Sequence, residues 1–372
     1  MKILILKTGS YSLEYCYYAS EKETSLFEGR LDNYRYSASD KIALQEVLWD
    51  ILKLCIDQSN GKGPDAVAIY SKFGGEAFPQ PTIADKDALL KMKSLIPRAP
   101  MQIPAALALV ECCQRLMAET PIVLVFGTSF FVPLPRRETM YGLDPKSSDA
   151  QGIRRYGFHS LFHEAAAQSL NKDKETSQKI ISICMGAQPE IAAIMGRSPV
   201  MVTSGITPLE GLPGHTTCGE IDPSISLILA KKFGWGPEKI DELLTRESGL
   251  FGLCGERMTF DEVFLSNDEK HRAAREIFQY RLMLSCGSAL AAMGGLDAIV
   301  FSGRYLAAGK FLADWLIAQP FFHSLKKERP YEVLFFTKSL ENLIAQKAAV
   351  TVLQQNNAKY NQEVSLCSAT EQ

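Results

Sequence analysis

Residues 203–225, TSGITPLEGLPGHTTCGEIDPSI, form a stretch rich in glycine, proline and threonine that precedes an apolar helical pattern. Loops of this length inside a compact domain are usually either functional or disordered. The apolar residues distributed along the stretch favour order, and Asp222 followed by Pro223 is typical of a helix start. The stretch therefore predicts an ordered, functional loop in front of a helix.

The length and composition of the chain predict a globular protein of two domains. Its 372 residues exceed one compact core, and 46% of them are apolar, so each domain can bury a core. The formal net charge of −2 argues against a nucleic-acid-binding domain, which would be basic. No apolar run approaches the roughly 18 residues of a membrane helix. The start MKILIL is short for a secretory signal, and nine irregularly spaced cysteines fit a reducing compartment, so we expect a cytoplasmic protein.

Alternating strand and helix patterns divide the chain into two halves. In residues 1–148, KILIL and DAVAIYSKF predict buried strands, with helical patterns between and after them. In residues 149–340, KIISICMG and DAIVFSGR predict buried strands among further helices. A last helix over about 341–356 is expected to pack back on the first half. The sequence thus predicts two α/β domains with mixed sheets and a cleft between them.

The stretch 154–167, RRYGFHSLFHEAAA, contains two histidines at helical spacing. His159 and His163 are four residues apart, so both could lie on one helix face. Zinc ligands use this spacing in H-E-x-x-H, but no glutamate stands between these histidines and no third ligand lies nearby. The other interpretations are a capped, partly buried helix start and a polar site residue. The pattern favours the helix start over a metal site.

Two glycine-containing stretches are candidates for a phosphate loop. In 302–311, SGRYLAAGKF, five residues separate the glycines where the phosphate-loop motif has four, and Phe311 replaces its magnesium-binding hydroxyl, so we reject this stretch. In TGSYS, Gly9 permits a tight turn, and Ser10 and Ser12 offer hydroxyl groups to a phosphate. An ordinary hairpin loop is the alternative interpretation of TGSYS.

Several stretches together resemble the motifs of the acetate kinase (acetokinase) family nearly end to end. They are RRYGFHSLFHEAA (family R-[KR]-Y-G-F-H-G-T-S-H), GITPLEGLPGHTTCGEIDPSI (family G-F-T-P-L-E-G-L-x-x-G-T-R-[CS]-G-x-[IL]-D-P), ESGLFGLCG (family K-S-G-L-L-G-[LI]-S-G), AMGGLDAIVFSG (family L-G-G-[VL]-D-[AG]-[IL]-V-F-T-[AG]-G) and KILILKTGSYSLEY (family opening strand with N-[AS]-G-S-S-S-[LI]-K). The resemblance implies the two-domain acetate and sugar kinase/Hsp70/actin fold, which is ribonuclease H-like. It also implies a homodimer, and a cleft in which MgATP phosphorylates a small carboxylate.

The resemblance also assigns roles to residues that match the family motifs. His159 resembles the histidine that steadies the transferring phosphoryl group, and His163 helps to build its helix. The remaining matched positions are Ser10, Ser12, Gly186, Ala187 and Gly303 for cofactor binding, and Phe158, Pro208, Lys72 and Arg98 for the substrate pocket. Phosphoryl transfer depends mostly on positioning and on neutralising charge, so the charged members of such a site matter most.

Most charged catalytic residues of the family pattern are replaced in this chain. At catalytic positions these are Tyr70 and Thr217 for two arginines, Gly127 for an aspartate and Cys184 for a second histidine. At nucleotide and loop positions they are Ala187 for an asparagine, Gln188 for a glycine, Lys7 for an asparagine, Glu14 for a lysine and Asp261 for an adenine-loop arginine. The family run I-G-E-N supplies a magnesium-linked glutamate, which is absent from the corresponding YLAA. No metal ligand is therefore retained.

Some cations are new relative to the family pattern. Lys72 and Arg98 fall near positions where the family has apolar residues around the acetate methyl group, and Lys7 and Arg304 are also new. A pocket with these cations could bind a small anion, which would favour a different acid or a repurposed ligand. The alternative is that Lys72 and Arg98 simply face water.

The sequence therefore predicts an acetokinase-fold pseudoenzyme with a binding, regulatory or scaffolding role. Loss of one preorganised transition-state donor costs roughly 10²–10³ in rate, and several are missing at once. Use of ATP and Mg²⁺, or binding of a nucleotide, is implied only by the resemblance. The rival interpretation is an active ATP-dependent kinase of acetate, or of another short-chain acid, that works through displaced residues.

Overall fold

The structure is a computed structural model that describes residues 1–8, 12–21, 23–32, 41–100, 102–144, 146, 152–171 and 177–370. Contacts divide the chain into two compact units, the first formed by Met1–Ser129 with the segment from Leu340 onward, and the second by Phe130–Ser339. The division falls earlier than the domain boundary expected near residue 148. One reason is that the Glu138 carboxylate accepts a 3.0 Å hydrogen bond from the Val202 amide, which ties the segment after Ser129 to the second unit.

The first unit is built on a six-stranded mixed sheet. Its strands are β1 Lys2–Thr8, β2 Ser12–Ala19, β3 Thr24–Asp32, β4 Ala66–Ser71, β5 Thr82–Ile83 and β6 Ile122–Phe126. The order is β3-β2-β1-β4-β6-β5; β1, β2 and β3 are antiparallel neighbours, whereas β4 pairs in parallel with β1 and β6. Every side chain of β4 and β6 is buried, as expected for parallel strands covered on both faces.

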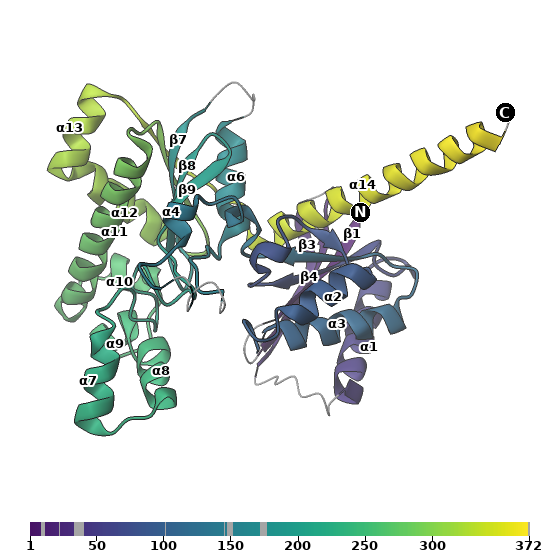
Figure 1. Cartoon of the computed structure of the whole chain (residues 1–372), viewed down its shortest axis with the longest axis horizontal. Helices are drawn as coiled ribbons and strands as arrows, with labels where there is room; N and C mark the ends of the chain where they lie inside the picture. The colour runs from purple at the N-terminus through teal and green to yellow at the C-terminus, as the bar shows by residue number, and fades with distance from the viewer. Residues whose placement is uncertain are drawn as a thin grey trace. The chain divides into compact units, whose positions relative to one another are not determined.

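Helices from both ends of the chain cover this sheet (Figure 1). They are α1 Lys41–Asp57, α2 Lys86–Ser94, α3 Gln102–Leu116 and α14 Leu340–Thr370, with the short turn η1 Gly75–Ala77; the turn η2 Ser129–Phe131 spans the division between the units. Both α3 and α14 contact β1, β4 and β6. Ile344, Ala345 and Ala348 of α14 are fully buried. The helix expected over 341–356 therefore begins where predicted and lies on the first unit, but it extends to Thr370.

The second unit repeats this plan with a five-stranded sheet. Its strands are β7 Lys179–Cys184, β8 Glu190–Met195, β9 Ser198–Val202, β10 Ala298–Ser302 and β11 Glu332–Phe335, in the order β11-β10-β7-β8-β9. Again three consecutive strands are antiparallel, and two later strands join them in parallel. The prediction of an α/β fold with mixed sheets is confirmed.

The second unit contains helices that contact its sheet, chiefly α6, α11 and α12, and helices such as α7 and α8 that lie away from it (Figure 1). They are α4 Arg136–Thr139, α6 Ser160–Leu170, α7 Ser224–Phe233, α8 Pro237–Arg246, α9 Gly249–Cys254, α10 Phe260–Leu265, α11 Arg272–Met293, α12 Leu306–Ala318 and α13 Pro320–Glu328, with the turn η3 Glu269–His271. The helix start expected at Asp222 and Pro223 is confirmed, because α7 begins at Ser224 and the Asp222 carboxylate accepts a 2.8 Å hydrogen bond from the Ser224 amide. In the described part of the chain, no helix has the length and apolar character needed to cross a membrane.

Candidate ligand site of the second unit

His159 lies at the N-terminus of α6, against the turn that follows β7. Its Nε2 atom is 2.9 Å from the backbone carbonyl of Gln188, and since a carbonyl only accepts, Nε2 donates. A Cβ atom at Gly186 would lie 3.1 Å from Cε1 of His159, so the turn needs a small residue there for the imidazole to pack. The prediction that His159 and Gly186 belong to one region is consistent with this contact.

The N-terminus of α6 is also bound by a buried carboxylate, that of Glu190 at the start of β8. It accepts hydrogen bonds of 2.9 Å from the backbone amides of both Phe158 and His159. His163 Nδ1 lies 2.8 Å from Ser182 Oγ, and His163 Nε2 lies 3.2 Å from Glu190 Oε1, a close contact whose geometry does not make a hydrogen bond. Glu190, His163 and Ser182 are all fully buried. The start of α6 is thus fixed by an internal polar network.

This network explains the charge of Glu190 and the role of His163. Burial by itself would raise the pKa of Glu190, but His163 and His159 outweigh it and hold the pKa at about 2. Among the described residues, no group of three or more His, Cys, Asp or Glu side chains is placed to hold a metal ion. His163 is therefore a buried partner of Glu190 that stabilises the helix start.

The ends of β7 and β10 meet beside this turn. Cys184 is fully buried, and burial together with the nearby Glu190 raises the pKa of its thiol well above the ordinary value. Gly303 has a φ of +95°, and a Cβ there would lie 2.8 Å from the backbone carbonyl oxygen of Met185. Only glycine fits this close approach of two backbones. Because the pKa of its thiol is raised, Cys184 is a neutral packing residue at neutral pH.

The loop after β9 is fixed to this turn by backbone hydrogen bonds. The His215 amide donates to the Ala187 carbonyl at 2.8 Å, and the Gly214 amide donates to the Thr217 carbonyl at 2.9 Å. The Thr217 side chain is buried against Gly214, and its Oγ1 atom has no hydrogen-bond partner. The loop is therefore ordered, as its apolar residues predicted, and it brings Thr217 and Ala187 into one region.

An aromatic cluster lies at the same loop. The His215 ring stacks on Phe260 with centroids 5.0 Å apart and an interplanar angle of 26°, and it lies 4.8 Å from the Tyr305 ring. Arg304 is exposed, with its guanidinium carbon 5.7 Å from the centre of the Tyr305 ring. Asp261 accepts a 2.7 Å hydrogen bond from the Ala308 amide in the first turn of α12. The Asp261 carboxylate therefore supports the start of a helix.

The other substrate-pocket positions of this unit differ in exposure. Phe158 is buried, whereas Pro208 is half-buried in the loop before α7. Glu210, two residues further on, binds Arg155 at 2.5 Å and accepts a 2.5 Å hydrogen bond from the Tyr141 hydroxyl. Tyr141 in turn accepts a hydrogen bond from the Ile206 amide at 2.9 Å. These contacts hold the start of the loop in place beside α4.

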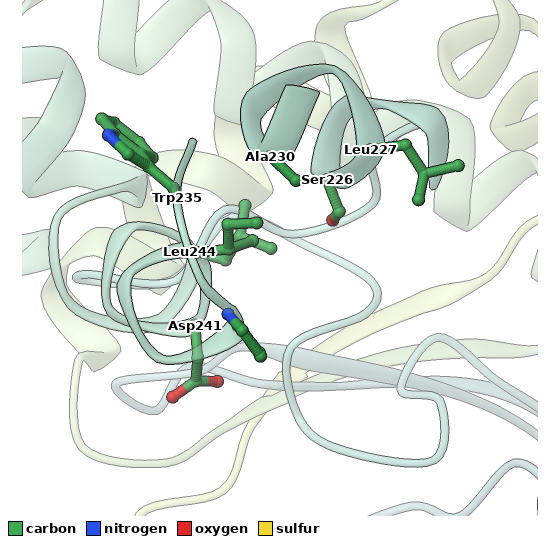
Figure 2. Close-up of a pocket in the computed structure, with 8 residues that line it drawn as sticks. Ser226, Leu227, Ala230, Trp235, Asp241 and Leu244 are labelled. Carbon is green, nitrogen blue, oxygen red and sulfur yellow. The ribbon is translucent and has the colours of Figure 1, made fainter. Parts of the chain in front are cut away.

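A separate groove lies between α7 and α8 (Figure 2). Its volume is about 410 Å³. The lining is mostly apolar and is made by Ser226, Leu227, Ala230, Trp235, Pro237, Ile240, Asp241 and Leu244. No side chain of α7 is buried in the described structure. None of the residues predicted for the site lies in this groove.

Comparison with known proteins identifies the family. A family model described as "Acetokinase family" matches residues 33–305. The chain belongs to the acetokinase family. It is 33% identical to an acetate kinase of Halothermothrix orenii over 333 residues, which cover 81% of this chain and 83% of that protein. It is 30% identical to an acetate kinase of Thermoanaerobacter pseudethanolicus over 358 residues, with 88% and 89% covered.

Solved structures of acetokinases share the fold. The acetate kinase of Porphyromonas gingivalis superposes with a TM-score of 0.80 at 24% identity, covering 94% of this chain and 99% of that one. A propionate kinase from Francisella tularensis gives a TM-score of 0.78 at 24% identity, with the same shares covered. The expected acetate and sugar kinase/Hsp70/actin type of fold is thus confirmed for this member of the acetokinase family.

The first unit of this acetokinase-family chain carries the remaining predicted residues. Lys7 of β1 binds Glu14 at 2.9 Å and also pairs closely with Glu341 of α14. Burial by itself would lower the pKa of Lys7, but Glu341 and Glu14 outweigh it and raise that pKa. Two carboxylates thus neutralise this new cation within the chain.

The other first-unit positions differ in burial. Tyr70 is buried at the end of β4, and the Gly127 amide donates to the Ser71 carbonyl at 2.9 Å, just after β6. Arg98 is exposed, and Lys72 is exposed over its side chain as a whole, but burial around its amine lowers the pKa of Lys72. Ser12 is half-buried at the start of β2, whereas Ser10 lies outside the described residues.

Sequence reasoning overlooked two residues that the structure makes prominent, Glu190 and His215. In the aligned acetokinase motifs, Glu190 stands at the final serine of C-H-L-G-N-G-[SA]-S, and His215 stands at the glycine of G-T-R. Each replaces a small residue by a larger polar one inside a motif. That increase in side-chain size at a motif position is the signal in the sequence that marks both residues.

Proposed function

We propose that this acetokinase-family chain is a pseudoenzyme that binds a small anion, nucleotide or protein partner without catalysing acetate phosphorylation. The observation that carries the proposal is that buried neutral groups stand at the catalytic positions of the second unit. Thr217 is packed against Gly214, and Cys184 is a fully buried neutral thiol. Neither can neutralise charge on a transferring phosphoryl group.

The charges of the described residues support the same proposal. Lys7 is paired with Glu14 and Glu341. These two carboxylates neutralise its positive charge, so Lys7 is not available to bind a phosphate. His159 Nε2 donates to the Gln188 carbonyl, so this retained histidine would have to break a bond before meeting a phosphoryl oxygen through that atom. Losses of this kind act together and are not additive.

The use of ATP and Mg²⁺ is implied by the family alone, and the residues of this chain at the magnesium-linked motif do not fit the metal. The run Tyr305, Leu306, Ala307 and Ala308 offers no carboxylate where the family motif has its glutamate. Mg²⁺ prefers oxygen ligands, usually carboxylates. The proposed binding role therefore does not depend on magnesium.

A rival proposal is an active kinase of acetate or another small acid. Lys72 and Arg98 support it, because both are exposed cations that could meet a carboxylate. We also propose a cytoplasmic homodimer that keeps the two-domain organisation of the family. The exposed apolar side chains of α7, among them Leu227 and Ile228, support the dimer. The described cysteines are free thiols, which fits a reducing compartment.

The test is ATP formation from ADP and acetyl phosphate with Mg²⁺, read by luciferase on the full chain. We expect the rate to equal the protein-free background in a preparation shown to be folded by circular dichroism. The control variants are His159→Ala and His323→Ala, the latter at an exposed histidine of α13. Activity that His159→Ala abolishes and His323→Ala preserves would establish the kinase instead. Propionyl and butyryl phosphate extend the assay to other acids.

A further inference from the structure

The groove between α7 and α8 begins at a short connection whose sequence restricts its conformation. Residues 233–237, FGWGP, join the two helices: Gly234 follows the end of α7 with a φ of +66°, and Pro237 begins α8. The ring of Trp235, which lines the groove, stacks on Phe233 with centroids 5.2 Å apart and an interplanar angle of 30°. A left-handed glycine and a proline in the first helical turn leave few conformations to this connection. The connection therefore holds α7 and α8 beside each other.

The walls of the groove are apolar and leave room for a small molecule. Ala230 lines the groove from α7, and Ile240 and Leu244, four residues apart, line it from α8. The volume of about 410 Å³ lies within the range of roughly 300–1,000 Å³ that is usual for small-molecule sites. Leu227, another lining residue, is 72% exposed. A ligand in the groove would remove this apolar surface from water, which favours binding.

The carboxylate of Asp241 is the one charged group among the described residues that line the groove. Figure 2 shows Asp241 and Trp235 on opposite sides of Leu244. Glu247, just after α8, is paired with Lys239 at 3.3 Å. In the part of the chain that the structure describes, by contrast, the Asp241 carboxylate forms no ion pair. A groove with apolar walls and one unpaired negative charge is complementary to a ligand with an apolar body and one positive charge.

We propose that the groove between α7 and α8 binds a small monoamine with an apolar body. The body lies between Ala230 and Leu244, and the ammonium group pairs with Asp241. An acid of the same shape is excluded, because its carboxylate would meet a like charge at Asp241. This inference goes beyond the proposed function, since the groove contains no residue of the quoted acetokinase motifs and its ligand is a cation.

The test is isothermal titration calorimetry of the full chain with 2-phenylethylamine at pH 7, where this amine carries a positive charge. We expect the wild type to bind it and Asp241→Asn to bind it about three- to fivefold more weakly, the usual contribution of an exposed ion pair. Ala230→Phe fills the groove and keeps the carboxylate, so it should abolish binding. Glu238→Gln removes an exposed carboxylate of α8 that does not line the groove, and it should match the wild type.

The ligand series provides a second comparison. 3-Phenylpropionate has the same ring with a negative charge, and we expect no measurable binding of this acid to the wild type. Raising the salt concentration should weaken binding of the amine, because the ion pair with Asp241 is exposed and is screened. Asp241→Asn and Glu238→Gln both change exposed side chains, so the comparison between them does not depend on a variant that perturbs the core.

Four results would overturn the proposal. The first is no binding of 2-phenylethylamine by the wild type, and the second is equal affinity of the wild type and Asp241→Asn. The third is equal binding of 3-phenylpropionate. The fourth is an affinity that falls as the protein concentration is raised, which would show that a second copy of the chain occupies the groove. The assay contains neither ATP nor an acyl phosphate, so its failure is distinguishable from failure of the proposed function.

Discussion

His163 Nε2 lies 3.2 Å from Glu190 Oε1 while both side chains are fully buried. The same carboxylate accepts the backbone amides of Phe158 and His159 at the start of α6. A buried charge of this kind is tolerated only when its partners are complete. The position of His159 at the start of α6 therefore depends on a residue of strand β8, 31 positions further along the chain.

Replacing Glu190 should destabilise the second unit in a pH-dependent way. The pKa of Glu190 is about 2 in the folded chain, below its ordinary value of 4.5, so its contribution is present above pH 4.5 and is lost as the pH falls toward 2. At pH 7 we expect Glu190→Gln to lower the free energy of unfolding by about 3 kcal/mol. Urea unfolding at pH 7 and at acidic pH measures this. Glu164→Gln, on the outer side of α6, should change stability by less than about 0.5 kcal/mol, and equal effects of both variants would refute the network.

Replacing Lys7 tests whether this cation is structural. Lys7→Met should cost about 1–3 kcal/mol at pH 7, because Glu14 and Glu341 then lie near each other without a cation. The pKa of Lys7 is raised above 10.5, so its contribution is present below that pH and is lost as the pH rises through the folded-state pKa. The control Lys53→Met removes an exposed pair with Asp50 and should cost less than about 0.5 kcal/mol. A Lys7→Met protein of unchanged stability but weaker anion binding would show that Lys7 serves a ligand.

Substitutions at two glycines with left-handed backbone conformations can distinguish the cost of backbone strain from the cost of steric crowding. Gly234 has a φ of +66° with open space around it, so Gly234→Ala should cost about 1 kcal/mol. Gly249 has a φ of +61° and faces the Thr217 carbonyl, so Gly249→Ala should cost about 3 kcal/mol or more. Thermal and urea unfolding of both variants gives the comparison. Equal costs would mean that the loop at Thr217 moves aside easily.

The proposed dimer can be tested on α7. Leu227 is 72% exposed and Leu90 of α2 is 64% exposed, so the two leucines are matched in exposure. Leu227→Asp should convert a dimer to a monomer, because a charge in an apolar interface loses its water. Leu90→Asp should leave the dimer intact. Light scattering coupled to gel filtration measures both masses, and a monomeric wild type would contradict the dimer directly.

The fold was predictable because its signals are local or belong to motifs. The apolar run KIISIC predicts a fully buried strand, and Asp222 with Pro223 predicts a helix start; both depend on neighbouring residues only. The glycines of the loops were informative for a similar reason. Gly303 must be glycine because a neighbouring backbone leaves no space for a side chain, and such a requirement is visible in a motif.

The resemblance to the family assigned positions to the candidate site, but not the internal partners of those residues. The sequence placed His159, Gly186 and Thr217 near one another, yet it gave no sign that Lys7 would meet Glu341, a residue 334 positions away. It also gave no sign that the carboxylate of Glu190 would accept hydrogen bonds from the backbone amides at the start of α6. Pairing across such separations depends on the assembled sheet, so composition and spacing do not contain it. The sequence therefore reveals which cations are new relative to the family pattern, but not which of them are neutralised by a carboxylate in the fold.

The return of α14 to the first unit constrains the order in which the chain folds during synthesis. The second unit is continuous in sequence, so it can fold as soon as it leaves the ribosome. The first unit is translated earlier but needs Leu343, Ile344 and Ala348 of α14, a helix that contacts β1, β4 and β6 and is translated after the second unit. A nascent chain stalled before Leu340 would thus expose an apolar sheet face and become a substrate for chaperones. Translation of α14, rather than of the first strand, marks when the first unit can close.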